Sequence, residues 1–357
     1  QTPDRMRKLA ILFYLLLPFL MWAQKPTTQF NGFGHLEYSM DYSDHADSYF
    51  SIGEHDFFVS SKLNNKISFL GEFVVRYNGS SGTTFLPSIE RGFLKFNYKN
   101  NRNLIVGKIH SPVNYWNDVY HHGRLFFPVI DRPNSFSYLV PLHTLGVQLQ
   151  GQNLGKSNFG YDIVIGNGIS SSDAFNDNVD MSLTAAFHFK PKEGMRIGAS
   201  YYYDLLEQNI SGVHSGHSSP RSHYSGPLYK GRLNYHLISA SYANFNESWE
   251  TLNEFTYNAT HTDSLGLANN FANFLYIGKR VKEKHVPYVL WDFMHIAHND
   301  LHTYELQTNK FAIGYKYEFS PFINIKAQIE RFTGGNHPTT QAHRDRTSLR
   351  VQFAYGF

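Results

Sequence analysis

The stretch Leu349-Arg350-Val351-Gln352-Phe353-Ala354-Tyr355-Gly356-Phe357 alternates apolar residues with polar or small ones and stops on an aromatic residue. Alternation with a period of two predicts a β-strand with one apolar and one polar face. Similar runs of about ten residues recur along the chain and are separated by polar breaks. In the run 67–77, for example, Phe69 and Phe73 lie on one face and Glu72 and Arg76 on the other. The pattern predicts an all-β protein.

The breaks between these runs are of two kinds, which alternate along the chain. The short ones contain Asn, Gly or Pro, which favour tight turns, and lie near 64–65, 100–101, 155–156, 191–194, 246–247, 281–284 and 320–321. The long, polar ones lie at about 42–49, 78–88, 111–142, 167–179, 204–228, 260–270, 296–309 and 333–346. This alternation predicts a transmembrane, antiparallel, up-and-down β-barrel of about 16 strands (14–18) with short periplasmic turns and long extracellular loops.

Composition supports a barrel and excludes other classes. The chain has 357 residues and no cysteine, which excludes a disulfide framework and an N-terminal lipoprotein anchor. Its formal charge of +3 gives no general electrostatic basis for binding nucleic acid. Aromatic residues make up 16% of a chain whose mean hydropathy is −0.39. A barrel with an apolar outside, a polar inside and two aromatic belts accounts for both values.

The N-terminal region predicts export. Arg7 and Lys8 precede the apolar segment Leu9 to Trp22, which is too short to span a membrane comfortably as a helix. We therefore interpret residues 6–23 as a secretory signal peptide cleaved after Ala23, and residues 24–357 as one barrel domain. Residues 1–5 lie upstream of Met6 and are interpreted as an artefact of how the start was assigned.

The C-terminal strand, following a predicted export signal, resembles the last strand of bacterial outer-membrane barrels. The resemblance implies that Phe357 and Tyr355 belong to the signal read by the barrel-assembly machinery. It also implies that the barrel lies in the lipid of the Gram-negative outer membrane.

The longest break, about 111–142 and here named loop three, is unusually apolar for a loop. It contains Tyr115, Trp116, Asn117 and the pair His121-His122. Such a loop is not expected to stay in water, so we predict that it folds into the lumen and constricts the pore. The alternative is that it packs over the barrel mouth or against a neighbouring subunit.

Charged residues on the expected inner face suggest a polarised pore. Basic candidates in the region 66–110 and in loop three are Arg76, Arg91, Lys95, Lys108 and Arg124, and acidic candidates are Glu72, Glu250, Glu254 and Asp292. Strands eight apart in a ring of sixteen face each other, so most of the basic residues would lie opposite the last three acidic ones. Such a field would orient dipolar solutes. The alternative is that the charges only keep the lumen wet. With Lys108 in the lumen, Lys108→Glu is expected to shift ion preference towards cations.

Three segments carry a closer resemblance: Ile89-Glu90-Arg91-Gly92-Phe93-Leu94, Val106-Gly107-Lys108-Ile109-His110-Ser111-Pro112 and Tyr115-Trp116-Asn117. They resemble porin-type barrels of Bacteroidota, which are distantly similar to the phosphate-selective porin O/P group. The resemblance implies a general or weakly anion-selective diffusion porin with Lys108 at the base of the constriction loop. Because acidic residues share the expected lumen, we do not extend phosphate selectivity to this chain.

These features predict an outer-membrane porin, without enzymatic activity or cofactor, for passive diffusion of ions and small hydrophilic solutes. A homotrimer is expected because barrel walls pack side by side in the bilayer. Two alternatives are a non-conducting structural or adhesion barrel and a hydrolase on the barrel rim, using residues such as Ser215, His217 and Asp263. The histidines near His214 and the pair His121-His122 lack a complete ligand set at ligand spacing, so no metal site is expected.

Overall fold

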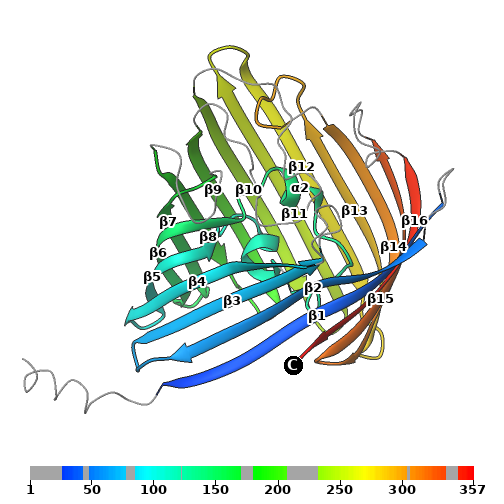
Figure 1. Cartoon of the computed structure of the whole chain (residues 1–357), viewed down its shortest axis with the longest axis horizontal. Helices are drawn as coiled ribbons and strands as arrows, with labels where there is room; N and C mark the ends of the chain where they lie inside the picture. The colour runs from blue at the N-terminus through cyan, green and yellow to red at the C-terminus, as the bar shows by residue number, and fades with distance from the viewer. Residues whose placement is uncertain are drawn as a thin grey trace, which may run out of the picture.

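The computed structural model describes residues 26–42, 48–77, 85–121, 123–169, 180–206, 232–303, 306–334 and 345–357. Within these residues sixteen antiparallel strands form one closed barrel (Figure 1). The first eight are β1 (Thr27–Asp41), β2 (Ser48–Lys62), β3 (Ile67–Tyr77), β4 (Phe85–Lys99), β5 (Arg102–His110), β6 (His143–Leu154), β7 (Phe159–Gly166) and β8 (Ser182–Phe189). The others are β9 (Met195–Leu206), β10 (Leu233–Phe245), β11 (Trp249–Thr262), β12 (Gly266–Lys279), β13 (His285–Ile296), β14 (Leu306–Ser320), β15 (Ile323–Gly334) and β16 (Arg346–Gly356). The predicted strand number and topology are confirmed.

Strand β11 shows how the sequence pattern becomes a barrel wall. Every second residue from Glu250 to Thr262 is buried, whereas the residues between them are exposed or half-buried. The buried set, which includes Leu252 and Glu254, faces the lumen and its contents. Phe255 and the other residues of the alternate set point outward, so one strand presents a different chemistry to each side.

The quoted C-terminal stretch closes the barrel. It forms β16, which pairs with β1 through Tyr38↔Val351 and Leu36↔Phe353. At its end the backbone groups of Gly32 and Phe357 exchange two hydrogen bonds, of 3.0 and 2.9 Å. Closure pairs both edges of the sheet, which is required of a sheet that lies in lipid.

The outer surface carries a broad apolar band. It includes Leu94, Val106, Val147, Ile165, Ile238, Val289, Phe311, Ile313, Ile325 and Ile329, all exposed in the isolated chain. Exposed aliphatic and aromatic side chains over so much of a barrel wall would be unfavourable in water and are favourable against lipid. Among the described residues, no helix combines the length and apolar character needed to cross a membrane.

The turns follow the predicted two-class pattern with one exception. All seven short connections lie where the sequence places them. The predicted long break at about 260–270 is wrong, because β11 and β12 remain paired up to Thr262↔Gly266 and leave only residues 263–265 as a turn. Gly266 has a φ of +70°, which a glycine adopts without strain and which completes this tight turn. The polar residues of this hairpin end therefore belong to the strands.

Candidate functional site in the barrel lumen

Loop three lies inside the barrel, as the sequence predicts. It connects β5 to β6 and contains the π-helix η1 (Trp116–Tyr120) and the short helix α2 (Asn134–Tyr138), which Figure 1 shows within the ring of strands. On β11 the Glu254 carboxylate accepts hydrogen bonds from Asn114 Nδ2 at 2.7 Å and from the Trp116 backbone N–H at 2.9 Å. On β13 the Asp292 carboxylate accepts one from the Asn134 backbone N–H at 2.9 Å. The loop therefore reaches the opposite wall.

Apolar packing holds one side of the loop. We name as the packed half the buried apolar residues of loop three together with those of the inner wall from β9 to β14. Its members include Val113, Trp116, Phe127, Val129, Phe136, Leu139, Val140, Tyr202, Tyr235, Leu252, Phe274, Tyr276, Leu290 and Met294. The ring of Trp116 packs edge-on against Phe127, with centroids 4.9 Å apart, and against Phe274, at 5.2 Å. This part of the lumen is a hydrophobic core rather than an aqueous channel.

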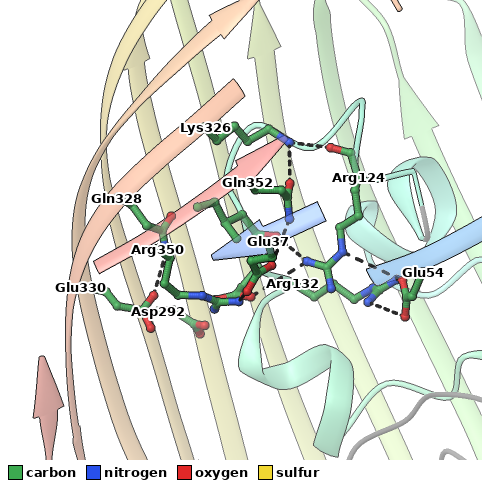
Figure 2. Close-up of polar contacts among 12 residues, drawn as sticks. Glu37, Glu54, Arg124, Arg132, Asp292, Lys326, Gln328, Glu330, Arg350 and Gln352 are labelled. Carbon is green, nitrogen blue, oxygen red and sulfur yellow. Dashed lines mark hydrogen bonds and ion pairs between the residues drawn. The ribbon is translucent and has the colours of Figure 1, made fainter. Parts of the chain in front are cut away.

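Charged side chains line the other side of the lumen, which we name the charged half. Its members are Glu37, Glu54, Arg76, Arg124, Asp131, Arg132, Lys310, Glu330 and Arg350. Figure 2 shows several of them converging from β1, β2, β15, β16 and loop three. The guanidinium of Arg350 lies between the carboxylates of Glu37 and Asp131 and donates to both. One strand residue thus links the barrel wall to loop three.

A second set of charge contacts joins the loop to β2. Arg132 donates to the Glu54 carboxylate through both terminal nitrogens, at 2.6 and 3.3 Å (Figure 2). Arg124 lies 4.0 Å from Glu54. Burial and the neighbouring charge of Arg132 lower the pKa of Arg124. Burial alone would raise the pKa of Asp131, but the charges of Arg350, Lys310 and Arg124 outweigh it and lower that pKa. The loop carboxyl is therefore held ionised.

Two cavities lie on the two sides of loop three. One, of about 510 Å³, is bordered by the charged half and by residues near the long-loop ends of β2 and β16, such as Tyr49 and Arg346. The other, of about 850 Å³, is bordered by Tyr115, Asp118 and Tyr120 of η1 and its flank and by the short turn 190–194. Burial raises the pKa of both Tyr115 and Tyr120, so these phenols stay neutral. The loop thus separates a cavity near the long loops from one near the short turns.

The predicted opposition of a basic wall and an acidic wall is not what the structure shows. Glu72 and Arg91 are register partners on β3 and β4 and form an ion pair. Arg76 pairs with Glu90 of β4. On the other side Glu250 is bound by Arg280 and by Lys316 at 3.1 Å, and Asp292 lies 3.5 Å from Lys310. These charges are thus largely balanced by neighbours on nearby strands, because cross-strand partners lie much closer than the opposite wall, whereas Glu254 accepts hydrogen bonds from loop three.

Two predicted pore-lining lysines differ in their placement. Lys95 is half-buried and lies opposite Ile105 on the inward face. Lys108 pairs in register with Leu145, and its face also carries the exposed Val106. Its amine donates to the backbone oxygen of Ile89 at 2.7 Å. The inward assignment of Lys108 is therefore wrong, since alternation along β5 places it with the lipid-facing residues.

The remaining predicted site residues are distributed as follows. In loop three Tyr115 borders the cavity near the short turns, and Asn117 is buried. His121, also buried, lies with His110 and His143 so that one ligand atom from each falls within 4.8 Å of the others. The Tyr355 hydroxyl and His55 Nε2 share a hydrogen bond of 2.8 Å. His122, His214, Ser215, His217 and His223 lie outside the described residues.

Most residues of the charged half were not predicted from the sequence as pore-lining residues. Asp131 and Arg132 lie in loop three. Arg350 lies in the C-terminal strand, in which only the aromatic residues Tyr355 and Phe357 had been given a role. Glu37 and Arg350 alternate with apolar residues of the opposite face, which was a usable signal, whereas Glu54 lies at a register shift between β1 and β2 that breaks the alternation. The partners of loop residues carry no sequence signal, because they depend on the path of the loop through the lumen.

No protein-family model and no curated protein matches the chain. Many solved structures do. They include an anion-selective porin from Comamonas acidovorans (TM-score 0.64, 9% identity, 93% of this chain and 100% of that one). They also include the outer membrane channel DcaP of Acinetobacter baumannii (TM-score 0.64, 10% identity, 94% and 99%). OmpT, an outer membrane protein of Vibrio cholerae in trimer form, is similar too (TM-score 0.62, 11% identity, 94% and 100%).

The chain has the porin-type fold of the outer membrane. At these identities the likeness concerns the fold, and the closed barrel with its apolar outer band agrees with it. The predicted location in the Gram-negative outer membrane is confirmed. The Bacteroidota and phosphate-porin resemblances remain predictions.

Proposed function

We propose that this barrel is a porin that lets ions and small hydrophilic solutes diffuse passively through the outer membrane, without a catalytic step. The observation that carries the proposal is the division of the lumen. Loop three packs against one wall through apolar side chains, and two cavities of about 510 and 850 Å³ remain beside it, the smaller one lined by charged side chains. Solutes would pass along the charged half, where loop three sets the size limit.

The charges on this path favour anions weakly. The cavity near the long loops is bordered by six cationic side chains (Arg76, Arg124, Arg132, Lys310, Arg346, Arg350) and four acidic ones (Glu37, Glu54, Asp131, Glu330), an excess of two positive charges. A small excess at a constriction biases ion permeation without making a dedicated anion site. The carboxylates beside these basic residues also argue against phosphate selectivity, which would need a continuous row of basic residues along the path.

We also propose that the chain is exported, inserted by the barrel-assembly machinery and assembled as a trimer. Residues 6–23 would direct secretion, and Phe357 with Tyr355 would present the signal for the barrel-assembly machinery. A homotrimer is proposed because lipid-facing walls of this size can pack side by side, and a structural neighbour is described in trimer form. Cross-linking in native membranes would test the trimer.

Single-channel conductance of the refolded mature chain in a planar bilayer tests the function. We expect stable ohmic steps and, in a KCl gradient, a reversal potential that shows weak anion preference. Replacing residues 114–140 by a short Gly-Ser linker should raise the conductance, because the loop occupies part of the lumen. A folded wild-type barrel that remains silent would favour the non-conducting structural or adhesion alternative.

A charge variant separates selectivity from size. Arg132→Gln removes a cation of the charged half and should lower the anion-to-cation permeability ratio. Arg331→Gln is the matched control, since the Arg331 side chain is about half exposed and pairs with Asp345 at the barrel rim. Equal reversal potentials for wild type and Arg132→Gln would remove the charged half from the permeation path.

A further inference from the structure

Three histidines from separate segments meet at the base of loop three. His110 is the last residue of β5, His143 is the first of β6, and the two are cross-strand partners. His121 follows η1 and stacks on His110, with ring centroids 3.4 Å apart. The Nε2 atoms of His121 and His143 are 3.1 Å apart. The cluster thus contains the residues that flank the loop and one residue within it.

The hydrogen bonds around His121 fix which of its ring nitrogens carries the proton. Asn117 Nδ2 donates to the backbone oxygens of Ser111, at 2.7 Å, and Leu142, at 3.1 Å. The amide oxygen of Asn117 therefore faces His121 and accepts from Nδ1–H at 2.6 Å. In the neutral ring this leaves the lone pair of Nε2 directed at the cluster. An outer hydrogen bond that fixes the tautomer is characteristic of metal-binding histidines.

Two buried carboxylates border the histidines, and each also pairs with an arginine, Glu90 with Arg76 and Glu72 with Arg91. Glu90 Oε2 lies 2.9 Å from His143 Nε2, and Glu72 Oε2 lies 3.7 Å from His110 Nε2. Glu90 is oriented through its other oxygen, which accepts from Arg76 and, at 2.7 Å, from Ser88 Oγ. Glu90 and Glu72 are nearly inaccessible to solvent. Three imidazoles with an adjacent carboxylate form a nitrogen-rich donor set, which is a typical set of ligands for Zn²⁺.

We propose that His110, His121 and His143 bind one Zn²⁺-type divalent cation, with Glu90 or water in the fourth position. Tetrahedral ligands about 2.0–2.1 Å from zinc lie about 3.3 Å from each other. The separations of 3.1 and 2.9 Å around His143 Nε2 need only a small expansion. The His110 ring must also turn out of its stack on His121 to aim a nitrogen at the same point.

Such a cation would clamp loop three. It would join the start of the loop, the end of the loop and His121, the residue after η1. His121 has a φ of 41°, which is unusual for a residue other than glycine. The site would hold the inward fold of the loop by coordination, in addition to the contacts of the packed and charged halves. This inference is independent of the porin proposal, because the cation would bind whether or not the barrel conducts.

Metal titration of the refolded, chelator-treated mature chain tests the site. His214, His217 and His223, which are close together in sequence, are replaced by serine in every sample to remove a competing signal. We expect one Zn²⁺ per chain by calorimetry, and Co²⁺ should give the visible absorption of a tetrahedral site. His121→Asn and His143→Gln should abolish this binding, and Asn117→Ser should weaken it by about 10- to 100-fold.

His188→Gln is the matched control, because His188 is a buried lumen histidine outside the cluster. It should bind Zn²⁺ as wild type does. In wild type Zn²⁺ should also slow proteolysis within loop three. Folding of every variant is checked by heat-modifiable gel mobility. A folded wild-type barrel without Zn²⁺ or Co²⁺ binding, or equal binding in His121→Asn and His143→Gln, would overturn the proposal. A proton-sharing histidine cluster would then account for the contacts.

Discussion

The packed half and the charged half hold the same loop by different physical means. In the packed half, apolar rings of loop three interdigitate with the inner wall from β9 to β14. In the charged half, Arg132 and Arg350 link loop three to carboxylates on β2 and β1. Apolar packing excludes water, whereas charged side chains retain it. The difference suggests that one half fixes the loop and the other leaves a wet path beside it.

Trp116→Ala should break the packed half and produce the largest effect. The side chain is 1% exposed and packs against Phe127 of the loop and Phe274 of β12. Removing a buried indole costs about 3–5 kcal/mol, because burial is lost and a cavity remains. We expect the free energy of unfolding, measured by urea titration in lipid vesicles, to fall by that amount.

Val119→Ala is the control for this variant. Val119 belongs to the same helix, η1, but it is about half exposed. Its truncation should change the free energy of unfolding by less than about 0.5 kcal/mol. Similar losses in the two variants would mean that the barrel stability does not depend on packing between loop three and the wall.

Lowering the pH should distinguish the two halves, because a histidine beside the packed half gains a proton whereas a carboxylate of the charged half stays ionised. His302, beside Tyr235 of the packed half, is buried, and burial lowers its pKa to about 4 although Asp300 opposes the shift. The neutral ring therefore stabilises the fold above its ordinary pKa of 6.5, and this contribution is lost as pH falls towards 4. Asp131 of the charged half has a lowered pKa and stays ionised over this range.

The expected loss between pH 7 and pH 4 is about 2–3 kcal/mol, measured by the same urea titration. His302→Gln should reduce this pH dependence, since glutamine does not titrate. If wild type and His302→Gln lost stability in parallel, another group would be responsible for the acid response.

The sequence predicted the wall of the barrel better than its contents. Period-two alternation and turn residues are local, so β11 and the seven short turns could be inferred from neighbouring residues alone. The pairing of Glu72 with Arg91 depends on the register between strands, and a β-bulge lies next to it, between Glu72 and Phe73. The contacts of Asp131 and Arg132 depend on the whole path of loop three. The meeting of His110 with His143 was predictable, because residues that flank a loop between antiparallel strands face each other.

Lys108→Glu gives the smallest expected effect and tests which face of β5 meets the solute. Lys108 shares the outward face with Val106 and Leu145, so reversing its charge should leave the reversal potential unchanged in a KCl gradient. Arg91→Gln is the matched comparison, because Arg91 lies on the neighbouring strand and its side chain, partly exposed, faces inward to Glu72. Removing that cation from the lumen should lower the anion-to-cation permeability ratio. A shift in Lys108→Glu as large as that in Arg91→Gln would place Lys108 in the lumen, and would restore the inward face that alternation along β5 rejects.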